Sequence, residues 1–321
     1  MIGIAQMIIL AFAILAVATW IVVISFAPRK ASTNRSPKIR ALTARAWLYA
    51  PIWVPTLLVL AAFLPALVGV VFSAADHCAL HGSHHHHPLC LIHPPHAASH
   101  AFIWLVPVVL SVFVALRIIP GITRAARERS MARSLVATSR PSDLGENVRL
   151  LDQSESLALT VGWRSPNVLL STGLIQDVSD TTLDVILAHE ASHVRRRDTL
   201  SALFDNLVAT LIPTDVAQAL LEDIALAREQ VCDEAAARRV GDPLLVAQAL
   251  TEVARRRMTV IATSISMSSS SLEARVLHIL EPPGTSNALP AHAIAVLVVL
   301  TLVGAFPVHS SIEYVFTYLL H

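Results

Sequence analysis

Four long stretches without Asp, Glu, Lys or Arg constrain the fold of this chain more than any other feature. They are Met1–Pro28, Trp47–Ala75, Ala101–Leu116 and Ala291–Val308. An α-helix crosses roughly 30 Å of hydrocarbon with about 20 apolar residues. The composition agrees, since 54% of residues are hydrophobic and 15% are charged, outside the usual range of soluble domains. The sequence therefore predicts a mainly α-helical membrane protein with about four transmembrane helices, near residues 5–27, 47–74, 101–119 and 291–309.

The basic residues between these stretches predict the sidedness of the chain. Residues 29–45 contain six Lys and Arg and no acid, and residues 117–133 contain five Arg and one Glu. Positive charge marks cytoplasmic segments, so we expect both to be cytoplasmic, the first of them as a loop. The N-terminus and a loop at 76–100 are then outside. The predicted domains are a membrane region (1–120), a cytoplasmic domain (121–288), and a fourth span with a short outer tail (289–321). Direct nucleic-acid binding by the basic run is not expected.

The outer loop is rich in histidine. Nine of the fifteen histidines lie between residues 77 and 100, together with Cys78 and Cys90. Neutral imidazoles at this density can bind Zn²⁺, Cu²⁺ or Ni²⁺, which makes His84, His85, His86 and His87 candidates for accessory metal binding. A disordered polar connector is an equal alternative. The two cysteines can form a disulfide, bind metal or remain free thiols.

The clearest chemical motif is His189-Glu190-Ala191-Ser192-His193. On a helix the two histidines lie about one turn apart on one face, where both imidazoles can bind one Zn²⁺. Glu190 then stands next to a zinc-activated water and can accept its proton as the water attacks a peptide carbonyl. A surface pair of histidines on an ordinary amphipathic helix would have the same spacing. A third ligand is therefore needed to distinguish a zinc site from such a pair.

A second helix supplies that ligand in our interpretation. We expect a helix over about 216–239, on which Glu229 and Asp233 share one face. Glu229 follows His193 by 36 residues, a separation that suits a third zinc ligand from a second helix. Asp233 would hold an imidazole N–H and so fix the tautomer of a zinc-binding histidine.

Local patterns predict the surroundings of this motif. Two short aliphatic runs, 157–162 and 167–171, are typical of a hairpin or a pair of neighbouring strands. A strand beside the site can bind an extended substrate by edge pairing, and a purely structural strand is an equal alternative. Ser179 or Asp180 is expected to cap the motif helix. Residues 200–212 are expected to pack along the membrane or within the helix bundle. The serine-rich residues 264–271 are expected to form a flexible linker.

Three segments together resemble a known family. They are Leu187–Asp198, Arg228–Asp233 and Leu272–Val276, and they look like the integral-membrane zinc peptidases of the BlaR/MecR type. The resemblance implies a cytoplasmic gluzincin-like α+β peptidase domain between spans three and four. It implies that His189, His193 and Glu229 bind zinc and that Glu190 is the general base. Asp233 would contact a zinc-binding histidine and not the metal itself. Those sensors carry a penicillin-binding domain after the last span; this sequence has about a dozen residues there, so beta-lactam sensing is not expected.

The expected function is hydrolysis of a cytoplasmic or juxtamembrane protein by a membrane-embedded, zinc-dependent endopeptidase. The resemblance implies a regulatory role, through cleavage of a transcriptional repressor or of the peptidase itself. Two alternatives remain open. One is a housekeeping peptidase of membrane-protein quality control, similar to the HtpX and CAAX-processing group. The other is a metal sensor that acts through the histidine-rich loop. A homodimer is compatible with the sequence.

Overall fold

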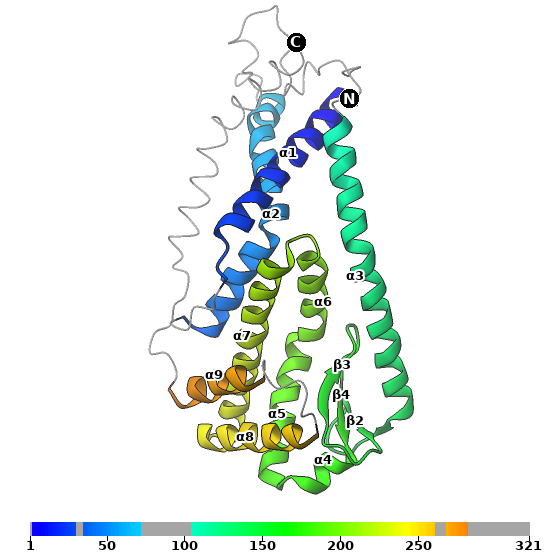
Figure 1. Ribbon diagram of the computed structural model, residues 1–321, viewed down its shortest axis with the longest axis vertical. Coiled ribbons are helices and arrows are strands. Elements are labelled where there is room, and N and C mark those ends of the chain that lie inside the picture. The colour runs from blue at the N-terminus through cyan, green and yellow to red at the C-terminus, as the bar shows by residue number, and fades with distance from the viewer. Residues whose placement is uncertain (1, 30–34, 72–103, 261–267, 282–321) are drawn as a thin grey trace, which may run out of the picture. The chain divides into compact units, whose positions relative to one another are not determined.

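The computed structural model describes residues 2–29, 35–71, 104–260 and 268–281 (Figure 1). The histidine-rich loop and the expected fourth span lie outside these residues. The chain divides into two compact units. One comprises Met1–Ala27, Ala46–Arg117 and Ala288–His321, and the other comprises Pro28–Arg45 and Ile118–Asn287. Helices α2 and α3 each contribute residues to both units.

The described residues of the first unit form long apolar helices. They are α1 (Ile2–Phe26) and the parts of α2 (Pro37–Val71) and α3 (Leu105–Thr138) that belong to this unit. Leu10 and Ala11 of α1 pack against Val59 of α2. Within the described residues three helices are long and apolar enough to cross a membrane, at Ile8–Phe26, Pro37–Leu64 and Leu105–Thr138. These helices support a membrane protein, as the composition predicts.

Two helix boundaries differ from the prediction. The basic segment expected as a loop is helical from Pro37 onward, so α2 begins ten residues before the apolar run. Helix α3 continues past the expected end of its span to Thr138, even though Pro120 lies inside it. Both extensions are rich in Ala and Arg, which favour the helical conformation once it has started.

The second unit contains a four-stranded sheet. Its strands are β1 (Arg140–Pro141), β2 (Val148–Leu151), β3 (Ala158–Val161) and β4 (Asn167–Ser171), in the spatial order β1-β2-β4-β3, which makes β3 an outermost strand. β3 and β4 are neighbours, as the two aliphatic runs predict, and pair antiparallel, whereas β2 pairs parallel to β4. The connection after β3 requires glycine, because Gly162 has φ +94° and a Cβ there would lie 2.7 Å from the carbonyl oxygen of Ser165.

Helices follow the sheet in an unbroken series through the rest of the described unit. They are α4 (Thr172–Asp177), α5 (Asp180–Arg196), α6 (Asp198–Ala209), α7 (Thr214–Val240), α8 (Pro243–Val260) and α9 (Ser268–Leu280). In Figure 1 the sheet lies on one side of α5 and α7 lies on the other. Val185, Ala236, Val246 and Ile279 bury their side chains together and join α5, α7, α8 and α9.

Two expectations can be compared with these helices. Residues 200–209 belong to α6, which packs against α5 and α7 inside the second unit. The expected linker at 264–271 is partly wrong, because Ser268–Ser271 form the first turn of α9. Serine is accepted in a first helical turn, where its hydroxyl can satisfy a backbone N–H that has no helical partner. Residues 264–267 lie outside the described part of the chain.

Candidate metal centre

The motif helix α5 is fixed at its start and along one face. The Ser179 hydroxyl caps the helix by accepting a hydrogen bond from the Thr182 backbone N–H at 3.2 Å. Leu183, Ile186 and Leu187 pack into a cluster with the inner residues of β2 and β4. The two histidines of the motif lie next to α7, whose Glu229 is close to both imidazoles. The cap and the packing on the sheet thus fix the helix that carries the histidines.

The two histidines face a carboxylate from α7. Nε2 of His189 lies 3.1 Å from Nε2 of His193. Glu229 places Oε2 3.4 Å from Nε2 of His189 and Oε1 3.5 Å from Nε2 of His193. One ligand atom from each residue lies within 4.8 Å of the other two. The structure therefore brings together the three residues that the sequence predicts as ligands.

The far nitrogen of each imidazole contacts a buried carboxylate. Nδ1 of His189 lies 2.9 Å from Oδ1 of Asp233, and Nδ1 of His193 lies 2.9 Å from Oδ2 of Asp198. Ionised carboxylates only accept, so each Nδ1 donates, and each imidazole in its neutral form carries its lone pair on Nε2. The two Nε2 lone pairs and the Glu229 carboxylate then point toward one position between the three residues. This donor set fits Zn²⁺, which binds histidine in this way when a carboxylate holds the second nitrogen.

Asp198 reaches His193 because the chain turns sharply after α5. Arg197 ends α5 and precedes α6 with φ 53° and ψ 44°, the left-handed conformation. For a residue with a Cβ this conformation costs about 1–2 kcal/mol. The turn places Asp198, the first residue of α6, beside a histidine five positions earlier. The sequence motif did not reveal this role, because only the unusual backbone of Arg197 brings the two residues into contact.

The electrostatics of the site favour a positive charge between the ligands. Burial alone would lower the pKa of His189, but hydrogen bonds to Asp233 and Glu229 outweigh it and raise the pKa to about 9. Burial alone would raise the pKa of Glu229, but the hydrogen bond with His189 and the charge of Arg275 lower it to about 2. Glu229 is thus anionic at neutral pH, and the site attracts a proton or a metal cation.

Glu190 lies next to the outermost strand of the sheet. Its side chain is buried, and Oε2 accepts a hydrogen bond of 2.6 Å from the Thr160 hydroxyl on β3. This bond orients the carboxylate that the sequence predicts as general base. It also connects the motif helix to β3, one of the two segments for which the sequence allows edge pairing with an extended substrate. Thr160 was not predicted as a site residue, because nothing in its local sequence marks it.

Arg275 of α9 contacts both carboxylates of α7. Its Nε and Nη2 donate to Asp233 at 2.8 and 2.7 Å, and its Nη1 lies 3.2 Å from Oε2 of Glu229. Burial alone would raise the pKa of Asp233, but the bonds from Arg275 and His189 lower it. The resemblance includes Arg275 in one of its segments, yet the sequence alone gave this residue no role.

A second group of metal-binding residue types lies beside the first. It consists of His193, Asp198 and Cys232, with Sγ of Cys232 3.4 Å from Nδ1 of His193 and 3.7 Å from Oδ2 of Asp198. Nδ1 already donates to Asp198, and a metal would have to replace that proton. Burial raises the pKa of the Cys232 thiol to about 12, so the thiol is neutral and is a poor ligand. Asp198 and Cys232 therefore contact His193 and do not form a separate metal centre.

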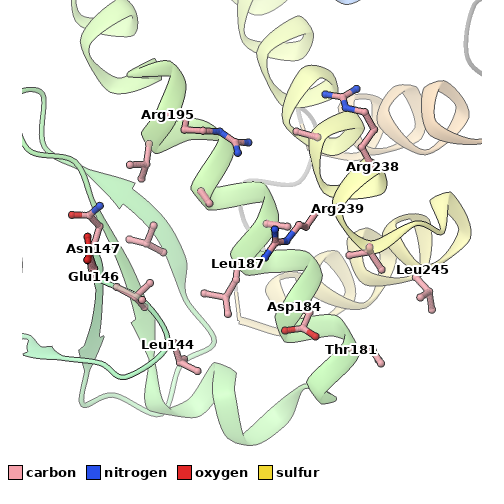
Figure 2. Close-up of a pocket in the computed structure, with 18 residues that line it drawn as sticks. Leu144, Glu146, Asn147, Thr181, Asp184, Leu187, Arg195, Arg238, Arg239 and Leu245 are labelled. Atoms are coloured by element: carbon pink, nitrogen blue, oxygen red, sulfur yellow. The ribbon is translucent and has the colours of Figure 1, made fainter.

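A groove of about 1070 Å³ follows a different face of α5 (Figure 2). Its walls are the turn before β2 and the last turn of α7. Asp184, Arg195, Arg238 and Arg239 supply much of its charge, while Ala188 and Ala191 lie along α5. The lining contains none of the three candidate ligands and does not include Glu190. The groove is thus distinct from the metal centre, although both use the same helix.

Comparison with known proteins agrees with this geometry. No curated protein shows significant similarity to the chain. Residues 123–271 match the model of peptidase family M48, and the match covers the four strands, α4 to α8 and the first turn of α9. It indicates protease activity, and peptidases of this family are typically zinc-dependent. The family match and the apolar helices together support a zinc metallopeptidase of a membrane type.

Proposed function

We propose that this chain is a membrane-bound zinc endopeptidase that cleaves a cytoplasmic or juxtamembrane protein. The observation that supports it most is the convergence of His189, His193 and Glu229, with a carboxylate behind each histidine. One Zn²⁺ held by these residues would supply the positive charge that activates water and polarises the scissile carbonyl. All three ligands come from one chain, so the site needs no residue from a second subunit.

The residues around the ligands have defined tasks in this proposal. Glu190 accepts a proton from the attacking water and passes it to the leaving amine. The Thr160 hydroxyl holds the Glu190 carboxylate in place. The outer edge of β3 pairs with an extended segment of the substrate, which places one peptide bond beside Glu190. A substrate must therefore present an unfolded or loosely folded segment.

We further propose that the cleavage has a regulatory role. The BlaR/MecR resemblance supports cleavage of a transcriptional repressor or of the peptidase itself on the cytoplasmic side. The match to family M48 does not choose between this role and membrane-protein quality control. Self-cleavage within Ser268–Ser271 would require the first turn of α9 to unfold, because edge pairing needs an extended segment.

Comparison of protein fragments in cells tests the function and separates the two roles. Cells that produce the wild type are compared with cells that produce Glu190→Ala, which retains the ligands and lacks the base. We expect fragments of one or a few regulatory proteins only with the wild type. Fragments of many unrelated membrane proteins would instead show quality control. Identical fragments in both cultures would contradict a peptidase function.

A further inference from the structure

The first turns of α2 carry two arginines that reach the helices of the metal centre. Arg40 and Arg45 lie in the part of α2 up to Arg45, which belongs to the second unit together with α6, α7 and α9, whereas α2 from Ala46 onward belongs to the first. Both arginines bind acidic side chains more than 150 positions later in the sequence. The helix that makes these contacts is also a candidate membrane span.

Arg45 begins a chain of contacts that ends at a candidate zinc ligand. Its Nε and Nη2 donate to Asp205 of α6 at 3.1 and 2.8 Å. Asp205 also accepts a hydrogen bond of 3.3 Å from Nη2 of Arg228 on α7. Nε of Arg228 lies 4.0 Å from Oδ1 of Asp198, the residue that holds His193. Arg45 thus reaches the metal centre through alternating charges.

Arg40 begins a second chain on the other side of α7. It binds Asp223, and its Nη1 donates to Oε1 of Gln230 at 2.9 Å. Nε2 of Gln230 donates to the carbonyl oxygen of Ala274 at 3.0 Å. Gln230 follows the ligand Glu229 directly, and Ala274 precedes Arg275, which holds Glu229 and Asp233. Arg40 therefore fixes the part of α9 from which Arg275 contacts the metal centre.

Burial distinguishes most of these groups from surface ion pairs, and the Arg45 side chain, which is 33% exposed, pairs with a buried carboxylate. Arg40 is 3% exposed, Asp205 is 2% exposed and Gln230 is 4% exposed. A buried charge that loses its partner is strongly destabilised, so such groups keep their relative positions. Arg29 and Asp215 are different, because their side chains are 52% and 69% exposed and an exposed pair constrains the fold little.

We propose that Arg40 and Arg45 are positioning residues of the metal centre. From α2 they hold α6, α7 and α9 in the arrangement in which the zinc ligands meet. The role rests on the zinc-peptidase function proposed above. It has a functional consequence, because a movement that withdraws these arginines from α6 and α7 loosens the zinc ligands without contact to the metal.

Zinc affinity of the purified full-length protein in detergent tests the role. The variants are Arg40→Gln, Arg45→Gln and Arg45→Lys, with Lys38→Gln as the matched control, since Lys38 is an exposed cation on the same helix. Competition with a chelator gives the zinc dissociation constant, and zinc retained by His189→Ala is subtracted as binding elsewhere. The absorption spectrum of Co²⁺-loaded protein reports ligand geometry, which a general loss of stability does not alter in the folded fraction.

We expect Arg40→Gln and Arg45→Gln to weaken zinc binding by about three- to tenfold, somewhat less than the loss of a direct neighbour of a ligand. Arg45→Lys keeps the charge but not the planar fork, and should lie between wild type and Arg45→Gln. If Arg45→Gln does not fold, Arg45→Lys and Arg40→Gln decide. Affinities and Co²⁺ spectra equal to those of Lys38→Gln would overturn the positioning role alone, whereas a wild type that binds no zinc at His189 would overturn the zinc-peptidase function as well.

Discussion

Arg275 holds Asp233 through two hydrogen bonds, and Asp233 in turn accepts a hydrogen bond from Nδ1 of His189. An arginine on the last described helix thus reaches a candidate zinc ligand through one carboxylate. Asp233 is 0% exposed, so its negative charge depends on these two partners. The contact adds a charged link between α9 and α7, whose apolar side chains also pack together.

The first prediction concerns the stability of this contact. Arg275→Gln should lower the free energy of unfolding by about 3–5 kcal/mol, because it leaves a buried carboxylate with one partner fewer. Thermal or chemical unfolding of the second unit measures the change. Arg238→Gln is the control, since the exposed Arg238 pairs with Glu234 on the same helix and its loss should change stability by less than about 1 kcal/mol. Equal stability of the two variants would contradict the role given to Arg275.

The second prediction concerns the orientation of the base. Thr160→Val removes the hydroxyl that donates to Glu190, while Thr160→Ser keeps it. A hydrogen bond to a charged group contributes about 1.5–3 kcal/mol, so we expect kcat for an unfolded protein substrate to fall roughly 10- to 100-fold in Thr160→Val. Thr160→Ser should remain close to wild type, and zinc content should be the same in both. A normal kcat in Thr160→Val would show that the bond has no catalytic importance.

The third prediction concerns the carboxylate behind His193. Asp198→Asn replaces an acceptor of the Nδ1 proton with an amide that can donate, which favours the wrong imidazole tautomer. Loss of such a partner typically weakens metal binding about 10- to 100-fold. Chelator competition should show this loss for Asp198→Asn and none for Asp184→Asn, an exposed acid on α5. An unchanged zinc affinity in Asp198→Asn would remove the supporting role that we assign to this carboxylate.

The fourth prediction concerns pH. The pKa of His189 is raised to about 9 by Asp233 and Glu229 against the effect of burial, so the imidazole is protonated below that pH before zinc enters. Zinc binds neutral imidazole, so binding must release this proton. The logarithm of the affinity should therefore rise by about one per pH unit between roughly pH 7 and 9 and level off above pH 9. Titration calorimetry in buffers of different ionisation enthalpy measures the released proton, and zinc uptake without proton release would contradict the assignment.

Local sequence features predicted the parts of the site that depend on neighbouring residues. The spacing of His189 and His193, the Ser179 cap and the two strand segments at 157–162 and 167–171 follow from helix and strand geometry over a few residues. Glu229 was proposed as a ligand because the motif requires a third one. The histidine spacing, the cap and the two strand segments required no knowledge of how distant segments meet.

The remaining parts depend on contacts that local patterns do not encode. The parallel pairing of β2 with β4 joins segments whose residues give no hairpin signal. Asp198 reaches His193 through the left-handed turn at Arg197, a residue that rarely takes this conformation. Arg275 and Asp233 are 42 positions apart, and Arg45 and Asp205 are 160 apart. Such pairs become visible only when the helices are packed together.

The most direct test of the central claim is a joint measurement of zinc content and proteolysis. Wild type, Glu190→Gln and His189→Ala are purified in detergent and assayed with an unfolded protein such as casein, with zinc bound by His189→Ala taken as the background. The account predicts one zinc above that background in both wild type and Glu190→Gln, and proteolysis in the wild type alone. Proteolysis by Glu190→Gln at the wild-type rate, or equal zinc in wild type and His189→Ala, would contradict it.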